Sequence, residues 1–241
     1  MKIKEKVYRV FLIIFLFIFI SIIFGTIFDN KSLIFSSNPI SLIIGFVIIS
    51  SFYYFIYKIF VSKFSKITIK QEIIMVVILF LILFAFQGVY VFCVASNPAW
   101  DWNDVFTASR LYASGLKDNI DWNYFQMFPN NNGILIIETM MFKLLNIVHI
   151  SSRYYYFFIA NIICIDLSIL LLYLTVRNIF DKRCAIFSII ISITNYAFYG
   201  YSYVFYTDTT TMLFPIFIIF LYSLYKKNKK PYIIILLLSI M

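Results

Sequence analysis

Long apolar runs separated by short basic segments restrict how this chain can fold more than any other feature. Six runs are long enough, or nearly so, to cross a bilayer as helices: residues 10–28, 40–61, 73–95, 154–176, 184–205 and 211–225. A further run begins at Tyr232 and ends at Met241. A helix of that length rises about 15 Å, half of the roughly 30 Å hydrocarbon layer. We predict an all-α polytopic transmembrane bundle of six full spans plus a partial seventh, and we expect the chain to be a fragment of a longer protein.

The composition also indicates membrane integration. The chain is 63% hydrophobic and 13% charged, so a soluble domain of this length could not cover its surface with polar groups. The net charge of +9 would suit nucleic acid, but basic residues also collect at the cytoplasmic ends of spans, and we prefer that explanation. No small-residue cleavage site follows residues 10–28, so we interpret this run as a retained first span and not as a signal peptide.

Residues 133–150 are ambiguous, because they are apolar but short and carry Glu138, Lys143 and His149. If this segment does not span, fifteen basic residues fall inside and five outside; if it does span, the two counts become roughly even. The positive-inside rule therefore predicts an interfacial or re-entrant helix on the outer face. The five outer basic residues are then Lys31, Arg110, Lys117, Lys143 and Arg153.

This topology predicts a multi-pass cell-membrane protein with a cytoplasmic N-terminus and an outer-face loop at residues 96–153. Seven of the eleven acidic residues then lie outside, and all three tryptophans lie in this loop. Because tryptophan favours the membrane–water interface, we expect the loop to contain interfacial amphipathic helices along the bilayer surface. We divide the chain into a two-span extension, residues 1–72, and a main transmembrane domain, residues 73–241.

The outer loop opens with WDWNDVFTASRLYASG, which brings two aspartates to the start of a helical pattern. Small or apolar residues recur there at helical spacing, at Val105, Ala108, Leu111 and Tyr112. Gly115 predicts the end of the helix. In a structural interpretation Asp101 caps this helix and Asp104 stabilises its positive N-terminal end. In a functional interpretation a carboxylate takes a proton from an acceptor hydroxyl, and the two interpretations are compatible.

Other polar positions have structural explanations of their own. Residues 121–133, DWNYFQMFPNNNG, carry a turn signature, and Asp208 before three threonines predicts a helix N-cap. Asp166 lies deep in the run at residues 154–176, where a carboxylate is costly unless it is paired, hydrated or protonated. It is either an interhelical contact or a functional group. The three cysteines show no paired spacing, and a single histidine, His149, excludes a His-rich metal site.

Three motifs follow one another in a definite order. An outer-loop Asp opens a helix that ends in Gly (AWDWNDVFTASRLYASG), YFQMFPNN enters a surface helix, and an outer YTD opens a later helix. In this order and sidedness, residues 73–225 resemble the N-terminal half of polytopic GT-C glycosyltransferases. The closest group is the bacterial branch related to protein mannosyltransferases and aminoarabinose transferases.

The resemblance implies a catalytic base at the first outer-loop Asp. Asp101 is the matching position by its spacing to Ala108 and Gly115. Family members often carry an acidic residue directly after this Asp, but here Trp102 follows, which leaves open whether Asp104 shares or takes the role. The resemblance implies further substrate-binding residues at Tyr124, Asn130, Asn131, Tyr206 and Asp208. Arg110 is an outer cation available to a phosphate, or a solvated charge.

The implied reaction transfers a sugar from a polyprenyl-phosphate donor to a cell-envelope glycan, lipid or protein on the outer face. No metal site and no cofactor are predicted, dependence on a divalent metal stays open, and nucleic acid is not an expected partner. The alternative is a non-enzymatic carrier or flippase for lipid-linked saccharides, which would place charges inside its spans, where Asp166 is the only deep one. A polysaccharide polymerase is disfavoured, because its outer loops are typically rich in arginine.

Overall fold

The computed structural model describes residues 39–63, 67–95, 97–149 and 153–228, and the regular structure in these ranges is helical throughout. The predicted first span and the partial seventh lie outside the described residues. Four helices within them are long and apolar enough to cross a membrane, Ile43–Phe60, Ile69–Val94, Tyr154–Ile179 and Thr207–Lys227. The prediction of an all-helical chain with several apolar spans is confirmed, but the count of six full spans is not.

The chain divides into two compact units, residues 1–62 and 63–241, which are described separately. In the first unit, α2 (Pro39–Lys63) covers the predicted second span. Most of its described apolar side chains are exposed, among them Phe46, Ile48 and Phe55 at 61–62%, whereas Phe60 is buried. A helix that is apolar on every side is suited to a lipid environment.

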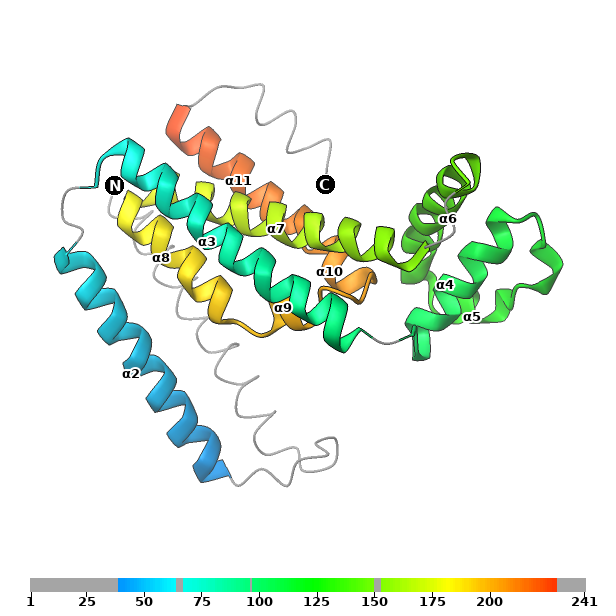
Figure 1. Cartoon of the computed structure of the whole chain (residues 1–241), viewed down its shortest axis with the longest axis horizontal. Helices are drawn as coiled ribbons and strands as arrows, with labels where there is room; N and C mark the ends of the chain where they lie inside the picture. Colours follow the sequence, from blue (N-terminus) through cyan, green and yellow to red (C-terminus); the bar gives the residue numbers. More distant parts are fainter. Residues whose placement is uncertain (1–38, 64–66, 96, 150–152, 229–241) are drawn as a thin grey trace, which may run out of the picture. The chain divides into compact units, whose positions relative to one another are not determined.

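The second unit contains a bundle of longer helices (Figure 1). α3 (Ile69–Val89) continues through a π-helical turn (Tyr90–Val94), and α7 (Arg153–Ile179) contacts both α8 (Lys182–Thr194) and α11 (Leu213–Asn228). α3 begins with a capping box: the Thr68 hydroxyl accepts from the Gln71 N–H at 3.2 Å, and the Gln71 side chain accepts from the Thr68 N–H at 3.0 Å. This local signal explains why the helix begins at Ile69.

Glu72 ties the start of α3 to α7 and α8. Its carboxylate is 2% exposed and accepts hydrogen bonds from Arg177 Nε at 2.5 Å and from the Tyr173 hydroxyl at 2.7 Å. Arg177 Nη2 reaches the second oxygen at 3.1 Å, and Lys182 Nζ lies 3.7 Å from it. A buried carboxylate is tolerated when it is paired and hydrogen-bonded in this way.

The prediction of a continuous span at residues 184–205 is wrong. α8 ends at Thr194, and the chain continues as irregular backbone with a single short helix, α9 (Ala197–Gly200). Asn195 ends α8 because its backbone is extended, and its side-chain oxygen accepts a hydrogen bond from the Ala197 N–H at 3.1 Å. Such local side-chain-to-backbone bonds offer the chain an alternative to the helix.

Polar side chains from α3 and α7 donate hydrogen bonds to backbone carbonyls of the irregular segment after α8. Asn161 Nδ2 lies 2.9–3.0 Å from three carbonyl oxygens, those of Tyr201, Ser202 and Val204. Gln87 Nε2 donates to the Phe198 carbonyl at 3.3 Å and to Asp166 Oδ1 at 2.8 Å. Non-helical backbone is tolerated at membrane depth only where protein groups form hydrogen bonds with it. Asn161 and Gln87 therefore stabilise the break in this segment.

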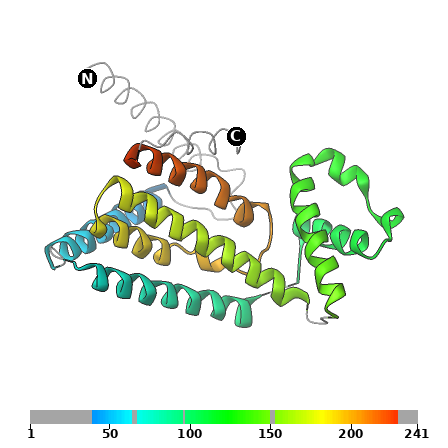
Figure 2. The ribbon, with the colours of Figure 1, turned by 90° about the horizontal axis from the view of Figure 1, so that it is seen from above.

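Residues 97–149 form a separate group of helices, called the lobe below (Figure 2). It contains α4 (Trp100–Ala113), α5 (Trp122–Met127) and α6 (Asn132–Ile147), with 3-10 turns at Lys117–Asn119 and Pro129–Asn131. α6 confirms a helix within residues 133–150, and its 16 residues are fewer than the about 20 needed to span a bilayer. It packs against α4, where the Phe106 and Phe142 ring centroids lie 4.9 Å apart.

Gly115 ends α4, as the sequence predicts. Its φ is +81°, the left-handed conformation that glycine adopts without steric cost. The Gly115 N–H donates to the Tyr112 carbonyl at 3.2 Å and the Leu116 N–H to the Leu111 carbonyl at 3.0 Å, which together make a Schellman motif. The chain therefore reverses at this point and returns along the lobe to α5.

Candidate functional site

Tyr124 lies where three segments distant in the sequence meet. It is 8% exposed, and Asn131 Nδ2 donates to its hydroxyl oxygen at 2.7 Å. Burial raises the pKa of Tyr124, and the neighbouring Tyr206 and the negative charge of Asp101 raise it further, against a smaller opposite effect of Asn131. The phenol therefore stays protonated near the Asp101 carboxylate. Four of the residues singled out in the sequence thus lie close together.

The turn that presents Tyr124 and Asn131 is built by local capping. Asp121 is the N-cap of α5, and its side chain accepts from the Asn123 N–H at 3.0 Å. Asn131 is 1% exposed, and Asn130 donates from Nδ2 to the Asn131 side-chain oxygen at 3.1 Å. Asn130 itself is exposed. It therefore positions Asn131, which in turn positions Tyr124.

The prediction that Asp101 caps α4 is wrong. The N-cap is Ala99, whose backbone is extended, and Trp100 follows with a left-handed φ of +53°. The helix therefore begins two residues earlier than a cap at Asp101 would place it, and Asp101 falls in its first turn. Asp101 is exposed, and within the described residues its carboxylate forms no hydrogen bond or ion pair. Its charge still lies at the positive end of the helix, where an acidic side chain stabilises the helix.

Asp104 lines a hollow of about 230 Å³ between α4 and α5. The polar residues of this hollow are Asn103, Asp104, Thr107, Asn119 and Asp121, and Tyr124 forms part of its wall. One oxygen of Asp121 is used by the α5 cap, whereas Asp104 is exposed. Asp101 and Asp104 are three residues apart on one helix and therefore lie on the same face. Tyr124 is thus close to both candidate bases.

The prediction that Asp208 caps a helix is also wrong. The helix that it opens, α10 (Thr207–Thr211), has Tyr206 at its N-cap, and Asp208 is exposed in the first turn. Tyr206 packs against the apolar core that joins the lobe to α7. The YTD motif therefore contributes a half-buried tyrosine beside Tyr124 and an exposed carboxylate two residues further along.

Arg110 is not brought to the other candidate residues. It is exposed in the last turn of α4, nine residues after Asp101, which corresponds to about 14 Å along the helix axis. The interpretation of all tryptophans as interfacial anchors is wrong for Trp102, which is 7% exposed and packs against Tyr203 at a ring distance of 6.4 Å. Trp100 is 91% exposed, so it can still lie at the membrane–water interface as expected.

Glu138 is a buried acid in the lobe that was not among the candidate site residues. It is 0% exposed, its Oε2 lies 3.0 Å from the Ser109 hydroxyl, and its Oε1 has no hydrogen-bond partner among the described residues. Burial raises the pKa of Glu138 to about 8, although the Ser109 hydroxyl lowers it in part. The side chain is therefore largely protonated near neutral pH. Its place in an apolar helical run was the signal that could have revealed it.

The interior of the bundle also holds a polar pair that the sequence could not assign. Asp166 was a candidate without a partner, and the structure gives it Gln87, whose amide donates at 2.8 Å. Gln87 is fully buried and comes from the predicted span at residues 73–95. A glutamine within such a run is the sequence signal for an interhelical contact.

The exposed apolar helices, the hydrogen-bonded polar side chains between them and the helical lobe define an integral membrane protein. A family model described as "Conserved hypothetical integral membrane protein" matches residues 1–241. The chain belongs to that family. No curated protein and no solved structure matches it.

Proposed function

We propose that this protein is a GT-C type glycosyltransferase. It moves a sugar from a polyprenyl-phosphate donor to a cell-envelope acceptor on the outer face of the cell membrane, with its N-terminus in the cytoplasm. The observation that carries the proposal is the meeting of Asp101, Tyr124, Asn131 and Tyr206, which come from three separate motifs of the resemblance. An order of short motifs in a sequence requires no such contact, so their meeting supports a common site.

In the proposed reaction, an acceptor hydroxyl oxygen attacks the anomeric carbon of the donor sugar. A new carbon–oxygen bond forms, the bond from the anomeric carbon to the phosphate oxygen breaks, and polyprenyl phosphate leaves with the bonding electron pair. The Asp101 carboxylate takes the hydroxyl proton and later releases it to water. Asp101 suits this role because it is exposed and free of hydrogen bonds within the described residues.

Tyr124 complements the base in this scheme. Its hydroxyl stays protonated, so it offers a hydrogen-bond donor beside an anionic carboxylate. Asn131 fixes the phenol by donating to its oxygen, and Tyr206 is the neighbour that interacts with the phenolic proton. In the proposed site, a sugar hydroxyl or the departing phosphate takes the place of Tyr206 as the acceptor of that proton. Asp104, on the same helix face, is the second candidate base.

One observation favours the alternative of a carrier for lipid-linked saccharides. Asp166 and Gln87 pair inside the bundle, next to the irregular segment that follows α8. Interrupted helices beside an intramembrane carboxylate are typical of transporter binding sites. A carrier would depend on Asp166 and not on the acids of the lobe.

The test is a transfer assay in membranes that contain the full chain, with radiolabelled polyprenyl-phosphate sugars as donors. Asp101→Asn should lower transfer by about 10²–10⁴-fold, because general-base assistance contributes on that scale. Asp118→Asn is the matched control, since Asp118 is an exposed acid in the 3-10 turn of the lobe. It should leave transfer unchanged.

Three outcomes would contradict this assignment. Full transfer by Asp101→Asn would exclude it as the base, and loss in Asp104→Asn alone would move the role to Asp104. If no variant of the lobe matters but Asp166→Asn stops movement of the lipid-linked sugar across the membrane, the carrier function replaces the transferase. Expression levels must match in each comparison.

A further inference from the structure

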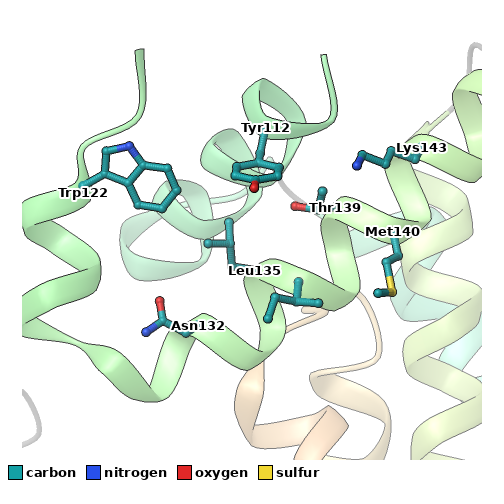
Figure 3. A pocket seen from close by; sticks show the side chains of 8 residues that line it. Tyr112, Trp122, Asn132, Leu135, Thr139, Met140 and Lys143 are labelled. Atoms are coloured by element: carbon teal, nitrogen blue, oxygen red, sulfur yellow. The ribbon is translucent and has the colours of Figure 1, made fainter. Parts of the chain in front are cut away.

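A second hollow of the lobe lies between the C-terminal part of α4 and α6, and the proposed reaction does not use it. Its volume is about 400 Å³, and the side chains that surround it include Tyr112, Trp122, Asn132, Thr139, Met140 and Lys143 (Figure 3). None of these residues lines the hollow at Asp104. Tyr112 lies eleven residues after Asp101 on α4, which separates the two along the helix by about 16 Å.

One wall of this hollow is aromatic and positively charged. The Tyr112 and Trp122 rings meet edge to face with centroids 6.2 Å apart. Lys117 Nζ lies 4.6 Å from the Tyr112 centroid and Lys143 Nζ lies 5.9 Å from it. Within the described part of the chain, neither ammonium group forms a salt bridge. Lys143 lines the hollow itself, and Lys117 adds a second positive charge at the same ring, so the surroundings of the hollow favour an anion.

The floor of the hollow carries a polar atom with nothing to bind. Thr139 is 6% exposed, and its hydroxyl has no hydrogen-bond partner in the described ranges. Figure 3 shows this hydroxyl on the lower side of the Tyr112 ring, and the Lys143 ammonium directed toward the same ring. Leaving a buried hydroxyl unpaired costs about 1–3 kcal/mol, so a ligand oxygen at this point would be favoured.

The open edge of the hollow is apolar and continues along α6. Ile136, Met140 and Leu144 follow at four-residue spacing and are 56%, 60% and 64% exposed. Residues at this spacing form one stripe on a helix. An apolar stripe on an amphipathic helix is the surface that lies in the acyl region of a bilayer, while the charged groups remain at the headgroup level.

We propose that this hollow binds the headgroup of an anionic lipid that carries hydroxyl groups. The lipid phosphate lies at Lys143, a headgroup hydroxyl pairs with Thr139 and Asn132, and the acyl chains follow Ile136 and Met140. Trp122 stands at the headgroup level. The adjacent apolar stripe favours a lipid as the source of the phosphate. This site does not depend on the transferase function.

Trp122 provides a direct measurement. The full chain is reconstituted in phosphatidylcholine vesicles, and tryptophan emission is quenched with lipids brominated in their acyl chains. Subtracting the Trp122→Phe signal isolates Trp122 from the two other tryptophans. Brominated phosphatidylglycerol should quench Trp122 at about threefold to tenfold lower mole fraction than brominated phosphatidylcholine, the size expected from one ion contact and one hydrogen bond.

Variants and lipid analogues separate the contributions. Lys143→Gln should abolish the preference for phosphatidylglycerol, whereas the matched control Lys70→Gln, an exposed lysine in the first turn of α3, should retain it. Phosphatidylmethanol has the same charge but no free hydroxyl, so it should bind more weakly than phosphatidylglycerol. Thr139→Val should remove that difference while leaving the preference over phosphatidylcholine.

Three results would overturn the proposal. They are equal quenching by the anionic and zwitterionic lipids, a preference that survives Lys143→Gln, and full displacement of phosphatidylglycerol by an excess of soluble glycerol 1-phosphate. The last result would show that the hollow takes a free phosphate compound and that the apolar stripe contributes nothing.

Discussion

Two acidic residues of the bundle and two of the lobe differ in their burial and in their hydrogen-bond partners. In the bundle, Glu72 is 2% exposed and contacts Arg177, Tyr173 and Lys182, and Asp166 accepts from Gln87. In the lobe, Asp101 and Asp104 are exposed and form no hydrogen bond or ion pair within the described residues. A carboxylate with all its partners inside the protein stabilises the fold, whereas one without partners is available to a ligand.

Glu138 is the exception that sharpens this contrast. It belongs to the lobe, yet it is as buried as Glu72, and it has one neutral partner where Glu72 has two cations. The two regions therefore offer three conditions for a carboxyl group: ion-paired, buried and neutral, or exposed and free. Each condition predicts a different response to substitution or to pH.

The largest effect is expected at the ion pair of Glu72. Arg177→Gln leaves a buried carboxylate without its main cation and should lower the free energy of unfolding by about 3–5 kcal/mol. Arg183→Gln is the matched control, because Arg183 bonds Asp181, which is 46% exposed, and exposed pairs contribute about 0–1 kcal/mol. Unfolding of the detergent-solubilised chain by titration with a denaturing detergent measures both. Equal losses in the two variants would remove the distinction between buried and exposed acids.

The next effect concerns the pH dependence of Glu138. Its pKa is about 8 in the folded chain and has a reference value of 4.5, so between these pH values the folded chain keeps a proton that the unfolded chain releases. Its contribution is full below about pH 4.5 and is lost as the pH rises toward 8, by roughly 2–4 kcal/mol. Glu138→Gln should flatten this dependence.

The measurement is the free energy of unfolding of the lobe from pH 5 to pH 9, followed by the emission of its tryptophans. Asp118→Asn, at an exposed acid of the same lobe, should leave the slope as in the unmodified chain. A wild-type slope that persists in Glu138→Gln would mean that another group titrates and that Glu138 does not cause the pH dependence.

Local signals in the sequence predicted the features that depend on a few neighbouring residues. The end of α4 at Gly115 and a short helix within residues 133–150 were both foreseen, since each follows from spacing and turn chemistry. The start of α4 was missed by two residues, because Trp100 adopts a left-handed backbone that no propensity favours for tryptophan. Asp101 was consequently taken for a cap.

Contacts across long stretches of the chain were beyond such patterns. The break after α8 depends on Asn161 and Gln87, which lie 34 and 108 residues before Asn195. Hydropathy alone treats residues 184–205 as one run, since it carries no information about which carbonyls a distant amide will satisfy. The proximity of Tyr206 to Tyr124 is also a contact between residues distant in the sequence. The order of motifs predicted that both belong to a site, but not that their side chains are neighbours.

The smallest effect is expected at Gly115. Its substitution tests whether local backbone geometry or buried contacts fix the position of the exposed acids in the lobe. Gly115→Ala meets no atom within 4 Å, so its cost is the left-handed backbone alone, about 1 kcal/mol. Gly133→Ala also meets no atom but lies in α6 without a left-handed φ, and should stabilise by about 0.5–1 kcal/mol. Opposite signs in lobe unfolding would show that Gly115 is required for its backbone conformation. A loss of several kcal/mol in Gly115→Ala would instead mean that the packing of α4 against α6 depends on the chain reversal at this residue. The position of the exposed acids at the start of α4 would then depend on buried contacts, as that of Glu72 does.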